Sequence, residues 1–204
     1  MQVMIPTKNA SWIVAARICL LGLIMLSPIG RAETGLPDDS IYHLESWWLN
    51  QNGEKTNIVD LRGTVQVVAF VYTYCEHSCP FIIANLKHIE EQLSSEQKQR
   101  VHFSLFSLDP GRDTPEVLKH YMHDHDLNEH LWAMFNGDPD DVLELSALMG
   151  VRYKPMDTEG KEIAHSNMIT VLDRQGRIQY QMKGLNEDLD LVVSAIAKAA
   201  DDPD

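Results

Sequence analysis

The chain has 204 residues, of which 44% are hydrophobic and 23% are charged, values that are ordinary for one globular domain with a sizeable core. Its 17 Lys and Arg residues are outnumbered by 30 Asp and Glu residues, which gives a net charge of −13. This balance argues against nucleic acid as a partner and against electrostatic docking on anionic lipid, because both need clustered basic side chains.

The first 32 residues have the pattern of a targeting segment. Lys8 and Arg17 precede an apolar run over residues 18–29, and the small residue Ala32 lies where a signal peptidase would cleave. The run is shorter than the roughly 20 residues of a membrane-spanning helix. We therefore expect a signal peptide, with an uncleaved N-terminal anchor as the alternative, and a periplasmic or otherwise exported protein. The anchor would be its only contact with the inner membrane.

Residues 33–204 are then expected to form one mature domain. It keeps 14 basic and 30 acidic residues, so its charge is −16. A hairpin is predicted first, with strands over 40–49 and 55–59 and the turn at Asn52-Gly53. A strand over 65–72 leads to a helix over 80–93, and a strand over 101–108 leads to a helix from Thr114. A strand over 131–135 is followed by a helix from Pro139 and a polar loop over 154–161. A hairpin of 163–172 with 177–182 and a helix over 188–200 come last.

This alternation of strands and helices predicts a thioredoxin-like α/β sandwich. A central mixed sheet would be flanked by helices and preceded by the N-terminal β-hairpin. The strand over 65–72 is rich in β-branched residues and should be buried. The helix after Pro80 repeats its apolar positions every three or four residues, as an amphipathic helix does.

Export leaves two cysteines, Cys75 and Cys79, on the turn between this strand and this helix. Near the positive end of a helix dipole a thiolate is favoured, and in a helical turn residues four apart share a face. Three interpretations stay open. A disulfide would close too small a loop to add much stability. A redox dithiol is more often spaced by two residues. A metal site of two thiolates would select a soft ion, above all Cu(I).

A third metal ligand has to come from the nine histidines, because zinc or an iron–sulfur cluster would want four protein ligands and only two cysteines remain. His165 is the first candidate, since it lies where a polar loop enters a long apolar strand at a sheet edge. In a thioredoxin-like fold that position is beside the first helix's N-terminus. His77 is an alternative, although a solvent-facing loop residue is the simpler interpretation. The histidine-rich segment His120–His130 could bind Cu(II) or Zn(II) weakly, but a solvated helix end explains it as well.

Three segments carry a resemblance to a known family. The stretch Val71-Tyr-Thr-Tyr-Cys-Glu-His-Ser-Cys-Pro80 resembles the Cys-x-x-x-Cys-Pro copper motif of the Sco/SenC family. Residues 107–118 resemble that family's second signature, in which Arg112 and Asp113 are expected to order a loop. Ala164-His165-Ser166 falls where the family places its histidine ligand. The similarity extends over about residues 38–200.

The resemblance implies a copper-binding metallochaperone rather than an enzyme. Members of the family bind copper, as Cu(I) or Cu(II), through two cysteines and a histidine, here Cys75, Cys79 and His165. They help to assemble the Cu-A centre of cytochrome c oxidase, so the expected partner is an apo copper protein, first of all the Cu-A subunit. A redox disulfide between Cys75 and Cys79 would have to be reduced before copper binds.

The alternative function is a thiol–disulfide reductase that acts on the cysteines of a target copper protein. Such reductases carry a proline at the start of the strand opposite the thiols, and the segment Ala164–Ser166 has none, which favours the metal. Two positions depart from the usual family pattern. Glu76 replaces a proline, and its charge should raise the thiol pKa and help to hold a cation. Ala164 replaces an aspartate that could orient the imidazole.

Overall fold

The structure is a computed structural model that describes residues 35–156 and 162–201. All of them belong to the unit of the chain that begins at Gly35. The predicted targeting segment 1–32 lies outside the described residues, and so do residues 157–161 of the predicted polar loop. Within the described part, no helix has both the length and the apolar character to span a membrane.

A mixed sheet of seven strands forms the centre of the fold, in the order β2-β1-β5-β4-β3-β8-β9. Strands β3, β4 and β5 run parallel, whereas β8 lies antiparallel beside β3. All seven residues of β3 are buried, which explains why six of them are apolar and only Gln66 is polar. The bounds are β1 (Trp47–Asn50), β2 (Lys55–Asn57), β3 (Val65–Val71), β4 (Val101–Ser107), β5 (Trp132–Gly137), β8 (Ile169–Leu172) and β9 (Ile178–Met182).

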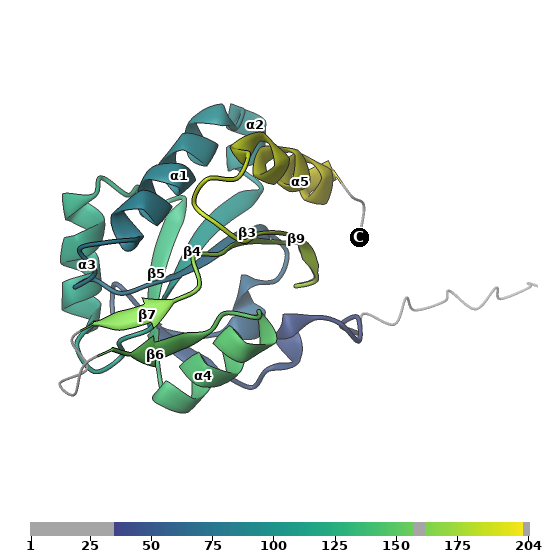
Figure 1. Ribbon diagram of the computed structural model, residues 1–204. Coiled ribbons are helices and arrows are strands. Elements are labelled where there is room, and N and C mark those ends of the chain that lie inside the picture. Colours follow the sequence, from purple (N-terminus) through teal and green to yellow (C-terminus); the bar gives the residue numbers. More distant parts are fainter. Residues whose placement is uncertain (1–34, 157–161, 202–204) are drawn as a thin grey trace, which may run out of the picture. The chain divides into compact units, whose positions relative to one another are not determined.

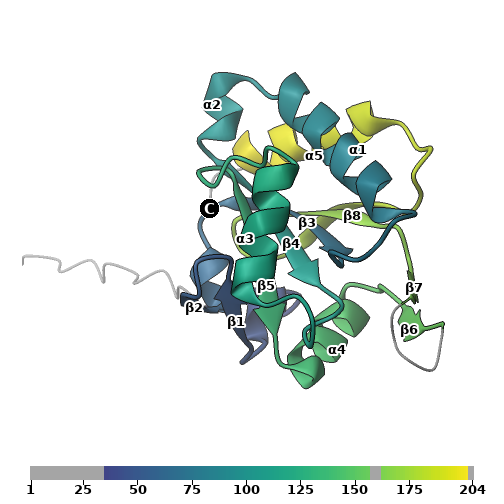
Figure 2. The same cartoon turned by 90° about the vertical axis from the view of Figure 1, so that its left-hand side faces the viewer.

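Helices cover the sheet on both sides. α1 (Cys79–Gln92) and α5 (Leu189–Asp201) pack side by side over one face, and α4 (Pro139–Leu148) lies on the opposite side (Figure 1). α3 (Pro115–Asp124) packs against β5, as the turned view in Figure 2 shows. The sequence did not predict the one-turn helix α2 (Ser95–Lys98). The buried residues of α1 match the predicted apolar face: Ile82, Ile83, Leu86 and Ile89.

The thioredoxin-like architecture and the N-terminal hairpin are confirmed. β1 pairs with β2, and Gly53 in the turn between them has φ +75°, a conformation that suits glycine. The hairpin strands are shorter than predicted, because residues 41–43 and 58–61 form turns of 3-10 helix. Asn57 is the last residue of β2 and the N-cap of the second of these turns, where its side chain accepts the N–H of Val59.

The predicted single strand over 163–172 is wrong. β7 (Ile163–His165) pairs with β6 (Tyr153–Pro155) in a separate two-stranded sheet, and only β8 joins the main sheet. The N–H of Ser166 extends this hairpin by donating to the carbonyl of Arg152 at 2.9 Å, and β8 begins three residues later, at Ile169. His165 therefore lies on a hairpin, β6–β7, rather than on the edge of the main sheet.

Gly137 offers a test of the packing between β1 and β5. It lies opposite Trp48, and a Cβ at this position would come within 2.6 Å of the buried indole ring. We expect Gly137→Ala to lower the free energy of unfolding by about 1–3 kcal/mol through overpacking, as measured by urea denaturation. Gly111→Ala is the matched control, because nothing lies within 4 Å of its Cβ position. Equal stabilities of the two variants would contradict this packing.

Candidate metal centre

The sheet topology brings three segments to one edge. The parallel strands β3 and β4 end side by side, and β8 begins next to the end of β3 because it runs antiparallel, with Ile169 opposite Ala69. The thiol loop, residues 72–78, follows β3 directly. The β6–β7 hairpin comes just before β8, so its last residue, His165, reaches the same edge.

The two cysteines and His165 form one compact group. Their ligand atoms all lie within 4.8 Å of one another, and the described ranges contain no second group of three His, Cys, Asp or Glu residues with this geometry. The Sγ of Cys79 is 3.5 Å from Nε2 of His165. Cys75 and Cys79 are buried free thiols, whereas His165 is half-buried. The expectation that His165 lies beside the N-terminus of the first helix is confirmed.

The sulfur of Cys75 takes the place of a capping side chain at the start of α1. Ser78, the N-cap residue, makes no side-chain capping bond, and the N–H of Cys79 donates to the Cys75 Sγ at 3.3 Å. The first N–H groups of a helix have no partner within the helix and carry partial positive charge. A thiolate at Cys75 is therefore stabilised where the chain turns into α1.

The two thiols have very different proton affinities. The Cys79 thiol donates to the Cys75 sulfur, and this bond, against the opposing effect of burial, lowers the pKa of Cys75 to about 3. The same bond, together with burial, raises the pKa of Cys79. The pair thus holds one thiolate and one thiol. The expected rise caused by Glu76 is wrong for Cys75, whose pKa falls because of its hydrogen bonds, and the Glu76 side chain is exposed.

The imidazole of His165 has its second nitrogen engaged. Nδ1 lies 3.2 Å from the carbonyl oxygen of Ser166, which can only accept, so the hydrogen is assigned to Nδ1 and the lone pair to Nε2. That lone pair is on the nitrogen next to Cys79. Histidines that bind metals commonly donate their other N–H to a carbonyl in this way. The ring of Tyr72 packs edge-to-face on the imidazole, with centroids 6.0 Å apart.

Asp113 supports the thiol loop from inside the protein. Its carboxylate is fully buried and accepts the N–H of Thr73 at 3.2 Å and the hydroxyl of Ser107 at 2.5 Å. These bonds join the ends of β3 and β4. Burial raises the pKa of Asp113, whereas its donors lower it. The predicted role of Asp113 in ordering a loop is confirmed, and Arg112 extends it by an ion pair with Asp109.

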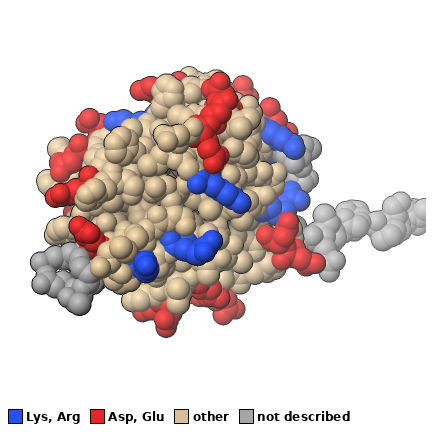
Figure 3. All heavy atoms as spheres, viewed as in Figure 1, with Lys and Arg blue, Asp and Glu red and all other residues tan. Residues whose placement is uncertain are grey.

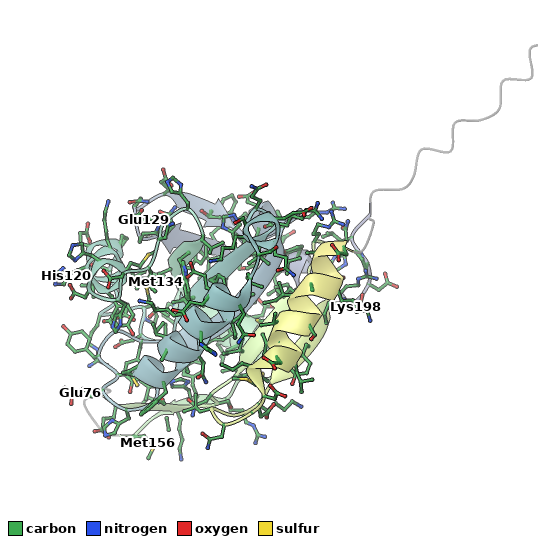
Figure 4. The ribbon with its side chains drawn as sticks, turned by 90° about the horizontal axis from the view of Figure 1, so that it is seen from above. Glu76, His120, Glu129, Met134, Met156 and Lys198 are labelled. Atoms are coloured by element: carbon green, nitrogen blue, oxygen red, sulfur yellow. The ribbon has the colours of Figure 1, made fainter. Side chains whose placement is uncertain are left out.

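The other candidate histidines lie outside this group. His77 is exposed on the thiol loop and is not part of the compact triad. His120 pairs with Asp124 at 3.3 Å on the exposed side of α3. In Figure 4, His120 and Glu129 are separated from Glu76, which marks the thiol loop. The interpretation of segment His120–His130 as a solvated helix end agrees with the exposure of three of its four histidines, His120, His123 and His130.

Two hollows border the metal centre, and neither is lined by a cysteine. One, of about 980 Å³, has His165 in its wall together with Arg152 and Lys154. The other, of about 390 Å³, has Tyr72, Glu76 and other residues of the thiol loop in its wall. On the face drawn in Figure 3, basic side chains are scattered among acidic ones rather than joined in one continuous basic surface.

Sequence reasoning missed Tyr72 as a residue of the site. The sequence predicts it as the last residue of the buried strand over 65–72, and its hydroxyl is the only sequence signal that it could form a polar contact. Its ring contact with His165 depends on the position of the β6–β7 hairpin, which was not predicted.

The family model described as SCO1/SenC matches residues 43–201 of this chain. The chain belongs to the SCO1/SenC family. It is 25% identical over 182 residues to the SCO1 protein homolog of Bacillus subtilis, an alignment that covers 88% of this chain and 94% of that one. It is 28% identical over 134 residues to a SCO2-like protein of Rickettsia typhi, covering 63% of this chain and only 64% of the relative's length.

Solved structures of the family have the same fold. A SCO1/SenC family lipoprotein from Bacillus anthracis has a TM-score of 0.69 at 25% identity, covering 78% of this chain and 95% of its own. Bradyrhizobium japonicum ScoI, solved with copper bound, has a TM-score of 0.61 at 23% identity, covering 76% and 96%. BsSco, a member of the Sco family of cytochrome c oxidase assembly proteins in which a disulfide switch was identified, has a TM-score of 0.65 at 24% identity, covering 76% and 90%.

The thiol pair predicts how reactivity depends on pH. In the reduced, metal-free protein we expect iodoacetamide to label Cys75 in mildly acidic buffer, where Cys79 stays protonated. Cys79→Ala should raise the pKa of Cys75 toward that of an ordinary thiol, because it removes the strongest stabilising hydrogen bond, and acidic labelling should fall. Rates are measured by mass spectrometry. Equal rates in the parent and in Cys79→Ala would contradict the assigned hydrogen bond.

Proposed function

We propose that the protein is an exported copper-binding metallochaperone that delivers copper to a copper protein, or prepares that protein's site. The Cu-A centre of cytochrome c oxidase is the first candidate. The observation that carries the proposal is the group of Cys75, Cys79 and His165, whose ligand atoms lie within 4.8 Å of one another. Membership of a family with copper-bound and oxidase-assembly members supports it.

The donor set favours copper over other metals. Two thiolates select soft ions such as Cu(I), and an added imidazole also suits Cu(II). A structural zinc site or an iron–sulfur cluster would take four protein ligands, and the described residues provide three in this group. Three ligands leave room for a donor from the target to approach. We propose transfer by ligand exchange, with the copper passing from this site to the acceptor.

Each ligand has a separate task in this scheme. Cys75 is already held as a thiolate at the start of α1. Cys79 loses its proton to solvent when copper binds, since only the thiolate is a good metal ligand. His165 offers the lone pair of Nε2 while its Nδ1–H bonds to Ser166. Copper affinity should therefore weaken as the pH falls, because protons compete with copper for the Cys79 sulfur.

We propose that the same sulfurs form a redox disulfide between Cys75 and Cys79. The disulfide holds no metal, and an exported reductant has to supply two electrons before copper can bind, with one proton taken up at Cys79 while Cys75 stays a thiolate. A disulfide switch was identified in the related BsSco. Copper loading would then depend on the redox state of the compartment.

The location and the partner belong to the same proposal. Residues 33–204 form the exported domain, and residues 1–32 are its signal peptide or its anchor. A family member from Bacillus anthracis is a lipoprotein, which agrees with a position at the outer side of a membrane. An apo copper protein, first of all the Cu-A subunit, is the proposed acceptor.

A thiol–disulfide reductase is the second candidate. The observation that favours it is the Cys75 thiolate at a helix N-terminus next to a protonated thiol, an arrangement that suits attack on a disulfide. Its reaction would transfer two electrons from the dithiol to a target disulfide and leave Cys75 and Cys79 oxidised. It would not need His165.

Copper titration of the reduced domain separates the two functions. We expect His165→Ala to lower the affinity for Cu(II) by more than about 100-fold, since even loss of a residue behind a metal ligand costs 10–100-fold. His77→Ala is the matched control, because His77 is an exposed histidine of the thiol loop outside the compact group, and this variant should bind copper like the parent. Unchanged Cu(II) affinity in His165→Ala would refute the ligand assignment. A parent that binds no copper yet reduces the acceptor's disulfide would establish the reductase.

A further inference from the structure

Tyr72 contacts two of the three residues of the proposed metal centre. Its side chain is buried, with 4% of its surface exposed. Its carbonyl accepts the backbone N–H of Cys75 at 3.2 Å. Its ring packs against His165 at an interplanar angle of 78°. One residue at the end of β3 is thus in contact with the backbone of Cys75 and with the imidazole of His165.

The hydroxyl group of Tyr72 bonds to the β6–β7 hairpin. It accepts the backbone N–H of Ile163 at 3.3 Å. Burial raises the pKa of Tyr72 to about 12, so the hydroxyl stays protonated at neutral pH.

The bond to Ile163 matters because the β6–β7 hairpin is separate from the main sheet. Among the described residues, β7 pairs only with β6. Ile163 begins β7 and His165 ends it, so a tie at Ile163 fixes the strand that carries the imidazole. The Tyr72 hydroxyl therefore links the hairpin to the end of β3, where the thiol loop begins.

We propose that the Tyr72 hydroxyl is a positioning group that holds the strand of His165 against the thiol loop. A phenylalanine at this place would keep the ring contact with His165 and lose the hydrogen bond to Ile163. The effect on copper rests on the proposed function, whereas the effect on the Ile163 amide does not.

Tyr72→Phe tests the proposal, with Tyr42→Phe as the matched control. Tyr42 is also buried, at 3% exposure, and its hydroxyl donates to the carbonyl of Leu61 at 3.2 Å, which is not part of the metal centre. Each variant loses one buried hydroxyl with its hydrogen bond. A merely structural role of Tyr72 would lower the thermal stability of both variants and change nothing else.

The first measurement is the exchange of the Ile163 amide hydrogen with solvent, followed by NMR in the reduced, metal-free protein. This amide donates to the Tyr72 hydroxyl at 3.3 Å, so we expect Tyr72→Phe to speed its exchange by about threefold to tenfold. Tyr42→Phe should match the parent. An Ile163 exchange rate in Tyr72→Phe equal to that of the control overturns the bond between the hydroxyl and the hairpin.

The second measurement uses the reduced domain titrated with Cu(II). We expect Tyr72→Phe to bind Cu(II) about tenfold more weakly, with the sulfur-to-copper absorption band moved to lower energy, and Tyr42→Phe to show neither change. Copper affinity and spectrum equal to those of the control overturn the positioning of His165. If the parent itself binds no copper, the proposed function fails, and the exchange of the Ile163 amide alone still decides whether the hydroxyl holds the hairpin.

Discussion

The antiparallel pairing of β8 with β3 is the interaction on which the metal centre depends. It sets Ile169 opposite Ala69, so the chain that leads into β8 has to pass the end of β3. The thiol loop starts at that end. Two segments separated by 86 residues, Cys79 and His165, are therefore brought to 3.5 Å by backbone hydrogen bonds in the buried middle of the sheet. The chemistry of the site is carried by loops, but its position is fixed by strands.

The start of α1 gives the site its electrostatic character. Helices need an acceptor for their first N–H groups, and here the Cys75 sulfur fills that need instead of a serine or aspartate side chain. The Cys75 sulfur thereby serves both as the hydrogen-bond acceptor that the start of α1 needs and as the thiolate of the site. The interaction with Cys75, together with burial, raises the pKa of Cys79 and keeps it protonated, so one more proton has to leave before both sulfurs are thiolates. Loss of the fold at this turn would remove the low pKa as well as the site.

The polar groups beneath the loop are arranged to keep it in one place. Asp113, fully buried, joins Thr73 and Ser107 at the ends of two strands. Tyr72 does the same on the other side by joining the β6–β7 hairpin to the loop. Buried polar groups are costly unless each has its partners, and both of these do. These hydrogen bonds thus hold the ligands in one geometry. A metal site needs such a defined geometry before the metal can be passed to another protein.

The sequence by itself determined the order of strands and helices, the buried β3, the amphipathic α1 and the two sulfurs at the turn between them, because local periodicity and turn residues carry that information. The place of His165 between a polar loop and an apolar strand made it the first candidate for a third ligand, and the family resemblance then assigned it. The tertiary structure decided that residues 163–172 divide between two sheets, since Ile163 and Ile169 have the same apolar character and only pairing partners distinguish them. It also decided the thiol pKa values and the role of Tyr72, which arise from atoms that meet only in the folded chain.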